Sequence, residues 1–245
     1  MLGKNMIGKI IIPARIDSKR LPRKALLDIG GEPMIVKTSM NAIEAVGQSN
    51  VFVATDSEEI KNCCDKYCIN SIMTSNCLTG TDRVIEAATV LGLKSVYNLQ
   101  GDEPLFPSRI IKKFIESTDK STYAVDMGVT TIRDIKELDS SKIPKVVFNN
   151  NKELMYTSRS RIPGSKDMSS EIGYKQVCIY KYNIEKLSEY NKIKNKTFFE
   201  SIEDLELLRL LESGVKVKCR FLDYHVHHSV DTHEDLVRVR REYGY

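Results

Sequence analysis

The sequence lacks an apolar run long enough to span a bilayer. The short apolar stretch near its start is soon followed by Pro13 and Arg15, so it does not fit a secretory signal either. Net charge is also small: 37 basic and 33 acidic residues leave +4, which does not suit a protein that coats nucleic acid. We therefore expect neither membrane insertion nor nucleic-acid binding.

A disulfide framework is missing as well. The six cysteines are unevenly spaced, with Cys63, Cys64 and Cys68 close together and no paired CxxC motif. This usage fits a reducing compartment, so we expect a cytoplasmic protein. The 245 residues are enough for one large α/β domain with a substantial core.

Apolar stretches of strand length alternate with segments of helical periodicity in the first half of the chain. The expected strands cover 10–12, 51–54 and 96–99, and helices are expected to begin near Pro33, Glu58, Thr81 and Pro107. The strands are continuously apolar, which is typical of parallel strands covered on both faces. The pattern predicts an α/β fold with a mostly parallel, Rossmann-like sheet flanked by helices.

The second half is richer in strand-like segments, such as "AVDMGVTTI", "KVVFNN", "KQVCIYKYN" and "VKVKCRFLDYH". This half is expected to add a β-rich elaboration. One helix is expected to carry an apolar stripe and to end at Gly214, the stripe being Ile202, Leu205, Leu208 and Leu211. A closing helix should begin at Thr232, with Asp235 completing a capping box.

Polar residues follow the expected strands at their carboxyl ends, where ligands of such folds bind. They are Arg15, Asp56, Gln100, Asp102 and Glu103. The loop after the first strand, "PARIDSKRLPRK", is strongly cationic, which suits a polyphosphate at a strand-to-helix loop. Neither GxGxxG nor a P-loop motif occurs, so the cations themselves would neutralise the phosphates. A solvated basic loop is the alternative.

Two distant acidic residues are candidates for a magnesium site. Asp102 lies in "NLQGDEP" at the end of the third strand, and Asp231 lies in "SVDTHEDL" before the closing helix. Carboxylates there would suit Mg²⁺, a hard ion that shares its coordination with substrate phosphates. Alternatively, Asp102 is a turn residue before Pro104 and Asp231 only caps a helix.

The order of motifs along the chain resembles the 3-deoxy-D-manno-octulosonate (Kdo) cytidylyltransferases, the CMP-Kdo synthetases. The resemblance spans nearly the whole chain and rests on "PARIDSKRLPRKALLDIGGEPMI", "VATDSEEI", "LTGTDR", "NLQGDEP", "MYTSRSRIP", "ESIEDLELLRLLESG" and "VDTHEDL". It implies a single domain, with a nucleotide-binding half over about 1–120 and sugar-binding and dimerisation elements over about 121–245. A homodimer is expected on the same ground.

The resemblance also implies an activity. Such enzymes use Mg²⁺ and CTP to join CMP to the anomeric hydroxyl of an acidic 3-deoxy-ulosonic sugar, releasing pyrophosphate, for lipopolysaccharide or capsule synthesis. Asp102 and Asp231 would hold one Mg²⁺, and a second Mg²⁺ would lie on the β- and γ-phosphates. Lys24 and Arg15 would bind the triphosphate and act in catalysis. The CTP-binding set would be Pro13, Ala14, Arg15, Ser18, Lys19, Arg20, Lys24, Gly80 and Arg83.

The family's sugar contacts fall on Gln100, Arg159, Gln176, Tyr180 and Glu206. Structural alternatives stand beside some of them: Arg159 as a surface residue, Tyr180 as a core residue, and Glu206 as a partner of Arg209 three positions on.

The chain departs from the family pattern in two places. It reads "QVCIY" where the family has HIGIY, which puts Gln176 at the histidine that contacts the sugar. A modified acceptor such as 8-amino-8-deoxy-Kdo is therefore one hypothesis; a nonulosonic acid, or a non-catalytic nucleotide-sugar-binding homologue, are others. Arg23 and Ala25 stand where Gly and Pro are common.

"HVHH" at 225–228 is read as a solvent-facing strand end in preference to a metal site.

Overall fold

The computed structural model describes residues 8–18, 20–166, 172–224 and 229–244. The chain forms two compact units. The first comprises Met1–Ile115 and His227–Tyr245, and the second comprises Glu116–Val226. The sequence expectation placed the C-terminal helix in the second half, whereas in the structure it groups with the first unit.

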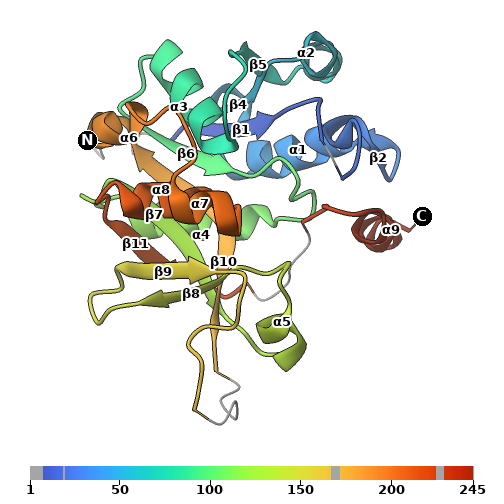
Figure 1. The fold of residues 1–245 in the computed structure, drawn as a ribbon. Coiled ribbons are helices and arrows are strands. Elements are labelled where there is room, and N and C mark those ends of the chain that lie inside the picture. The colour runs from blue at the N-terminus through green and yellow to red at the C-terminus, as the bar shows by residue number, and fades with distance from the viewer. Residues whose placement is uncertain (1–7, 19, 167–171, 225–228, 245) are drawn as a thin grey trace, which may run out of the picture. The chain divides into compact units, whose positions relative to one another are not determined.

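The first unit contains four parallel strands in the order β6-β1-β4-β5 (Figure 1). They are β1 (Ile10–Ala14), β4 (Val51–Thr55), β5 (Asn70–Met73) and β6 (Ser95–Leu99). Ile10, Ile11 and Ile12 are fully buried, as expected for a strand covered on both faces. The predicted mostly parallel α/β fold is confirmed.

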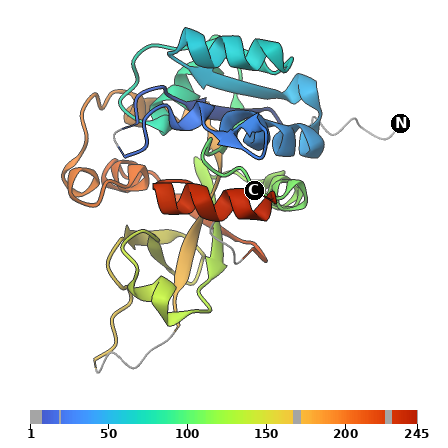
Figure 2. The same ribbon diagram turned by 90° about the vertical axis from the view of Figure 1, so that its right-hand side faces the viewer.

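Helices form in the predicted places; the first three connect these strands, and the fourth follows β6 (Figure 2). They are α1 (Met34–Val46), α2 (Glu58–Lys66), α3 (Gly80–Val90) and α4 (Ser108–Thr118). The side chains of Ser57 and Thr79 accept from the main-chain N–H groups of Ile60 and Asp82, so each caps its helix. None of the helices in the described part of the chain has the length and apolar character needed to cross a membrane.

Short elements that the sequence reading missed lie between β1 and α1. A 3-10 turn, η1 (Lys24–Leu26), precedes a two-stranded hairpin of β2 (Asp28–Ile29) and β3 (Glu32–Pro33). Gly30 and Gly31 form its turn with φ of +64° and +86°, a region that favours glycine. A second 3-10 turn, η2 (Gln48–Asn50), follows α1.

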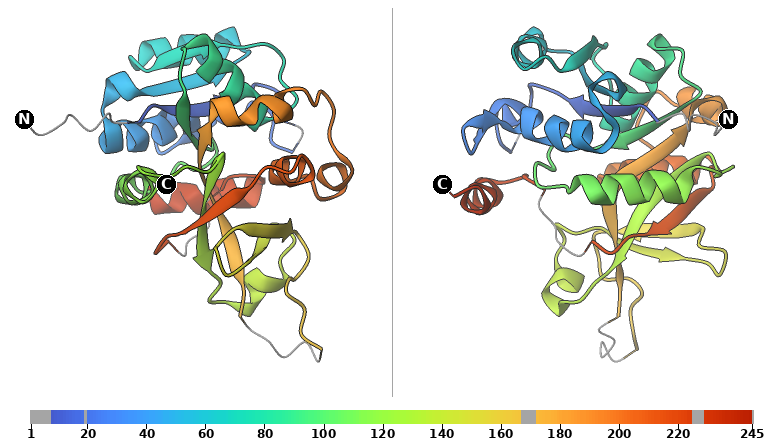
Figure 3. Two further views of the ribbon diagram at one scale, coloured as in Figure 1. Left: turned by 90° about the vertical axis from the view of Figure 1, so that its left-hand side faces the viewer. Right: turned by 180° about the vertical axis from the view of Figure 1, so that it is seen from behind.

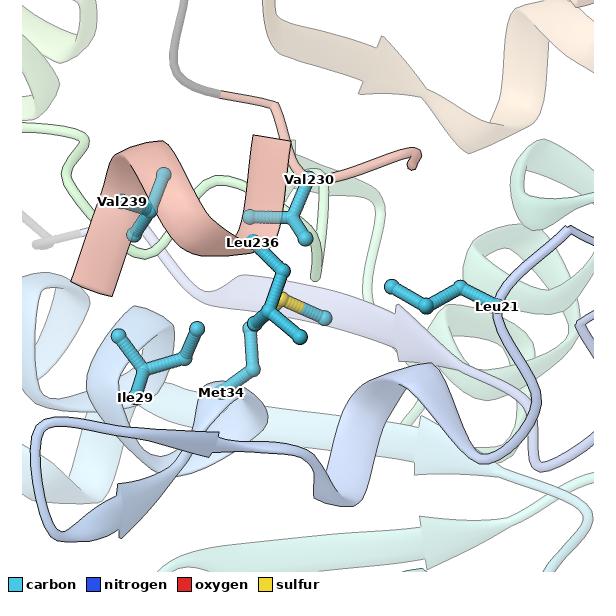
Figure 4. Close-up of a cluster of buried hydrophobic side chains, with 6 residues drawn as sticks. All are labelled: Leu21, Ile29, Met34, Val230, Leu236 and Val239. Carbon is cyan, nitrogen blue, oxygen red and sulfur yellow. The ribbon is translucent and has the colours of Figure 1, made fainter. Parts of the chain in front are cut away.

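The closing helix α9 (His233–Glu242) has the predicted capping box of Thr232 and Asp235. Its apolar face packs on the hairpin region through a buried cluster (Figure 4). From the C-terminal segment come Val230, Leu236 and Val239, and from the early chain come Leu21, Ile29 and Met34. This cluster fixes the segment that carries Asp231 beside the segment that carries Lys24.

The second unit is rich in strands, as predicted, and most of them pair antiparallel. Its strands are β7 (Val125–Thr131), β8 (Lys145–Phe148), β9 (Leu154–Ser158), β10 (Tyr174–Asn183) and β11 (Val217–Phe221). β10 pairs antiparallel with β7 and with β8, β8 pairs antiparallel with β9, and β11 lies parallel beside β7 (Figure 3). The register of β10 shifts between Val177 and Tyr180, at a β-bulge.

The prediction of one helix ending at Gly214 is wrong in its first half. The structure has two helices, α7 (Phe198–Glu203) and α8 (Glu206–Glu212), and Asp204 between them adopts φ of +52°. Ile202 is 65% exposed, so it does not join Leu205 and Leu208 in the core. The remaining helical elements of this unit are short: α5 (Ile135–Asp139), η3 (Ile184–Leu187) and α6 (Ser188–Asn191).

Candidate active site

The carboxyl ends of β1 and β6 bring two predicted loops together. Pro13 and Ala14 are buried at the end of β1, and Arg15 is exposed directly after them. Gln100 is half-buried after β6. A Cβ at Gly101 would lie 2.7 Å from the Pro13 carbonyl oxygen, so only glycine lets the "GDEP" loop pass this close to β1.

The ammonium of Lys24 holds both predicted metal carboxylates. Its Nζ lies 2.7 Å from Asp102 Oδ2 and 3.1 Å from Asp231 Oδ1. The three side chains are only 18%, 24% and 32% exposed, so bulk water screens their interaction weakly. Burial disfavours the charged form of Lys24, but the two carboxylates outweigh it and raise the pKa of Lys24 above its usual value. Lys24 is therefore a cation at neutral pH.

Main-chain hydrogen bonds hold the Asp231 segment in place. The N–H of Val230 donates to the Asp102 carbonyl oxygen at 3.0 Å, and the N–H of Asp231 donates to Asp235 Oδ2 at 3.2 Å. Asp235 also accepts from the N–H and hydroxyl of Thr232. Burial of Asp235 disfavours its charge, but these hydrogen bonds lower its pKa overall. Asp231 therefore does not cap its own helix; Thr232 and Asp235 do.

A second cation from the predicted loop reaches the same carboxylate. Arg20, with a side chain 62% exposed, places a guanidinium nitrogen 3.0 Å from Asp231 Oδ1. Ser18 is half-buried earlier in the loop. Lys19, also predicted to bind CTP, lies outside the described residues.

The "TGTDR" motif forms the start of α3. Gly80 is its first residue, and Arg83 is only 3% exposed. Guanidinium nitrogens of Arg83 lie 2.6 Å from Asp56 Oδ2 and 2.5 Å from Thr74 Oγ1. Arg83 therefore ties α3 to the residues that follow β4 and β5, which places Gly80 beside the same edge of the sheet.

Glu86 was not predicted, yet it fixes the loop before α3. Its carboxylate accepts from the Ser75 N–H at 2.6 Å, from the Ser75 hydroxyl at 2.5 Å and from the Cys77 thiol at 3.3 Å. Burial opposes ionisation of Glu86, but these donors together lower its pKa. The only sequence signal was its position on α3, one turn after Arg83.

In the second unit, Arg159 is more than a surface residue. Its guanidinium donates to the carbonyl oxygens of Glu203, Asp204 and Ser141 at 2.6, 3.2 and 3.1 Å. The main-chain N–H of Arg159 also donates to Glu203 Oε2 at 2.9 Å. These contacts join β9 to the break between α7 and α8.

Gln176 and Tyr180 meet across the bulge in β10. The Gln176 amide nitrogen lies 2.6 Å from the Tyr180 hydroxyl. Tyr180 is 4% exposed and stacks on Tyr182 with ring centroids 6.0 Å apart. Its ring is therefore packed in the core, as the structural alternative proposed. The side-chain carbonyl oxygen of Gln176, Oε1, is buried and has no hydrogen-bond partner among the described residues. It is an unused acceptor.

Glu206 is the half-buried first residue of α8. Arg209 forms an ion pair with Glu200 at 3.1 Å, and both side chains are almost completely buried. The Arg209 guanidinium also lies 4.7 Å from the ring centre of Tyr190. These contacts hold α8 against α7 and α6.

The carboxylates present suit a hard cation. Asp102 and Asp231 already converge on one ammonium, and both offer oxygen ligands. Within the described ranges, no three His, Cys, Asp or Glu side chains gather as metal ligands. Such a pair fits Mg²⁺, which takes one or two carboxylates and completes its shell with water and phosphate oxygens. The "HVHH" residues at 225–228 lie outside the described part of the chain.

Solved structures share this fold. The CMP:2-keto-3-deoxy-manno-octonic acid synthetase complexed with CTP superposes with a TM-score of 0.87 and 32% identity, covering 96% of this chain and 98% of that one. An inositol-1-phosphate CTP transferase from T. maritima gives a TM-score of 0.66 at 15% identity, covering 97% and 96%, which shows the fold alone. The fold is that of a nucleotidyltransferase.

Sequence comparisons narrow this class. The family model for cytidylyltransferases matches residues 9–217. A 3-deoxy-manno-octulosonate cytidylyltransferase from Polynucleobacter necessarius is 38% identical over 95% of this chain and 94% of its own length. An 8-amino-3,8-dideoxy-manno-octulosonate cytidylyltransferase from Shewanella pealeana is 37% identical over 93% and 94%. The chain belongs to the cytidylyltransferase family, among the CMP-Kdo synthetases that its motifs resemble.

Proposed function

We propose that this chain transfers CMP from CTP to the anomeric hydroxyl of a 3-deoxy-ulosonic acid, Kdo or a modified Kdo, for lipopolysaccharide or capsule synthesis. The anomeric oxygen attacks the α-phosphorus, and the bond from that phosphorus to the oxygen bridging to the β-phosphate breaks. Pyrophosphate leaves, and the hydroxyl proton is released. The transfer needs positioning and charge neutralisation and no covalent enzyme intermediate.

The observation that carries the proposal is the meeting of Asp102 and Asp231 at Lys24, beside the carboxyl ends of β1 and β6. These two carboxylates would hold Mg²⁺. When bound, the ion supplies a Lewis acid that polarises the α-phosphate and lowers the pKa of the attacking hydroxyl. Lys24, Arg20 and Arg15 offset the charge of the triphosphate and of departing pyrophosphate.

The remaining nucleotide contacts come from main chain and from α3. Pro13 and Ala14 end β1 where the base and ribose would lie, and Gly80 is the first residue of α3. Arg83 is already engaged by Asp56 and Thr74. Its role in nucleotide binding is therefore to position the loop that faces the base.

For the acceptor, we propose Gln100, Arg159, Gln176, Tyr180 and Glu206. A guanidinium has five N–H donors, and main-chain carbonyls use three of those on Arg159. The others are available to the sugar carboxylate. Gln176 offers its unpaired carbonyl to a donor on the sugar, either a hydroxyl or the ammonium of an 8-amino group. Relatives named for both sugars fit this choice.

The test is pyrophosphate release from CTP and Mg²⁺ with a panel of acceptors: Kdo, 8-amino-8-deoxy-Kdo, N-acetylneuraminic acid and a sugar 1-phosphate. Turnover with one or both octulosonates is the expected result. Turnover only with N-acetylneuraminic acid would move the assignment to nonulosonic acids, and turnover only with the sugar 1-phosphate would reject the acceptor class. No turnover with any acceptor would indicate a non-catalytic homologue.

We further propose a cytoplasmic homodimer. The support is the family to which the chain belongs and the six free cysteines, which a reducing compartment would maintain. Light scattering of the purified protein gives the oligomeric state directly.

A further inference from the structure

The amine of Lys24 occupies the place where the proposed metal would bind. It lies 2.7 Å from an oxygen of Asp102 and 3.1 Å from an oxygen of Asp231, which are hydrogen-bonding distances to both. These are oxygen atoms that a metal ion between the two carboxylates would use. An ammonium and a divalent cation cannot share this position, because both need the same lone pairs and carry charge of the same sign.

The charges around the two carboxylates balance without a metal. Asp102 and Asp231 carry two negative charges, and Lys24 and Arg20 bring two positive charges within 3.1 Å of them. A cation that approaches from solution therefore meets a neutral, occupied cluster. Displacing Lys24 alone would leave a half-buried ammonium without its partners, which costs free energy.

Lys24 can exchange partners without moving its backbone. It lies in η1, where the Leu26 N–H donates to the Arg23 carbonyl at 2.9 Å and Ala25 is 6% exposed, so the turn is anchored. Its side chain is a flexible four-carbon stem that ends in a point charge. A triphosphate on the loop after β1 would offer that charge several oxygens and a higher negative charge than the aspartates.

We propose that Lys24 keeps the metal site closed until a nucleotide arrives, so that divalent-cation binding at Asp102 and Asp231 depends on CTP. This inference rests on the proposed function, since the triphosphate is what draws Lys24 away. Coupling between two ligands is reciprocal, so the cation in turn strengthens nucleotide binding. Metal and CTP then enter together, which avoids a metal-loaded site that lacks its substrate.

The test measures binding of Mn²⁺ alone, by electron paramagnetic resonance of the free ion, to nucleotide-free protein. Lys24→Met removes the competing charge and keeps the length of the side chain. We expect it to raise the Mn²⁺ affinity by about fivefold or more, the lower end of usual coupling between two sites. Lys24→Gln serves as the second variant should methionine impair folding, and the same increase is expected.

Lys37→Met is the matched control, because Lys37 is 19% exposed and pairs with Glu32 at 2.7 Å in the same unit. It should leave Mn²⁺ affinity unchanged. The gain should vanish in the double variant Lys24→Met, Asp102→Asn. Unchanged or weaker Mn²⁺ binding in folded Lys24→Met, or a gain that survives Asp102→Asn, would overturn the proposal. Because no nucleotide or sugar is present, this result is independent of whether the acceptor assignment is correct.

Discussion

The main-chain N–H of Val230 donates a hydrogen bond to the carbonyl oxygen of Asp102 at 3.0 Å. This contact joins the two segments that carry the candidate metal carboxylates, although they lie far apart in the sequence. On its other side, Val230 belongs to the buried cluster beneath α9, with Leu236 and Val239. The geometry of the site therefore depends on the packing of the C-terminal helix.

Leu236→Ala tests that dependence. Leu236 is 2% exposed, so its truncation should lower the free energy of unfolding by about 2–5 kcal/mol and loosen the Asp231 segment. Urea unfolding measures the first effect, and kcat for pyrophosphate release, measured where the variant is still folded, measures the second. The control is Leu138→Ala in the second unit, where the leucine is 1% exposed. Equal kcat values for the two variants would contradict the proposed link.

Arg23 tests the backbone of the cationic loop. It adopts φ of +56°, a left-handed conformation that costs a residue with a Cβ more than glycine. Its ion pair with Glu59 is solvent-exposed and contributes little. Arg23→Gly and Arg23→Ala both lose that pair and differ only in the cost of the left-handed conformation. We therefore predict that the free energy of unfolding, measured with urea, is about 1 kcal/mol higher for Arg23→Gly than for Arg23→Ala. An alanine variant of equal or greater stability would show that the left-handed conformation is not strained.

Gln176 tests acceptor choice. Its buried carbonyl oxygen is unpaired in the described structure, so a donor on the sugar should gain from it. Gln176→His restores the family residue and removes this acceptor. We predict that the ratio of kcat/KM for 8-amino-8-deoxy-Kdo to that for Kdo falls by about tenfold, the equivalent of one hydrogen bond. An unchanged ratio would place Gln176 outside the recognition of the modified position.

Two buried thiols predict an alkaline limit to stability. Burial raises the pKa of Cys64 and of Cys219 to about 12, from an ordinary value of 9.0. The folded state therefore keeps protons that the unfolded chain releases. Their contribution is complete below pH 9 and is lost as the pH rises toward 12, by about 1.4 kcal/mol per pH unit for each thiol.

Urea unfolding over that pH range provides the measurement. Cys219→Ala should lose stability less steeply than the parent protein, whereas Cys68→Ala, at an exposed position, should match the parent slope. The same slope in all three proteins would show that the buried thiols do not control alkaline stability.

Local signals predicted three of the four parallel strands of the first unit, but not β5 or the short hairpin of β2 and β3. The apolar runs at 10–12, 51–54 and 96–99 became β1, β4 and β6, because continuous apolar character and short length leave few alternatives to a buried parallel strand. The capping box of Thr232 and Asp235 was also predicted correctly, because a capping box depends only on two residues three positions apart.

Non-local contacts account for what was missed. The apolar stripe through Ile202 and Leu205 looked continuous, but the left-handed Asp204 interrupts the helix there, and the buried Glu200–Arg209 pair joins the two resulting helices. Likewise, Arg159 was expected to face a sugar carboxylate, and its binding to main-chain carbonyls could not be read from the sequence. The pairing of Lys24 with Asp102 and Asp231 depends on tertiary packing in the same way.

Substitution of Asp102 and Asp231 tests the proposed metal site most directly. We measure kcat for pyrophosphate release in Asp102→Asn and Asp231→Asn, with Asp65→Asn as a control at a 52% exposed surface carboxylate. We predict that each site variant folds normally and loses about 10²–10³-fold or more in kcat, while the control stays close to the parent protein. Near-parental kcat in either folded site variant would contradict it.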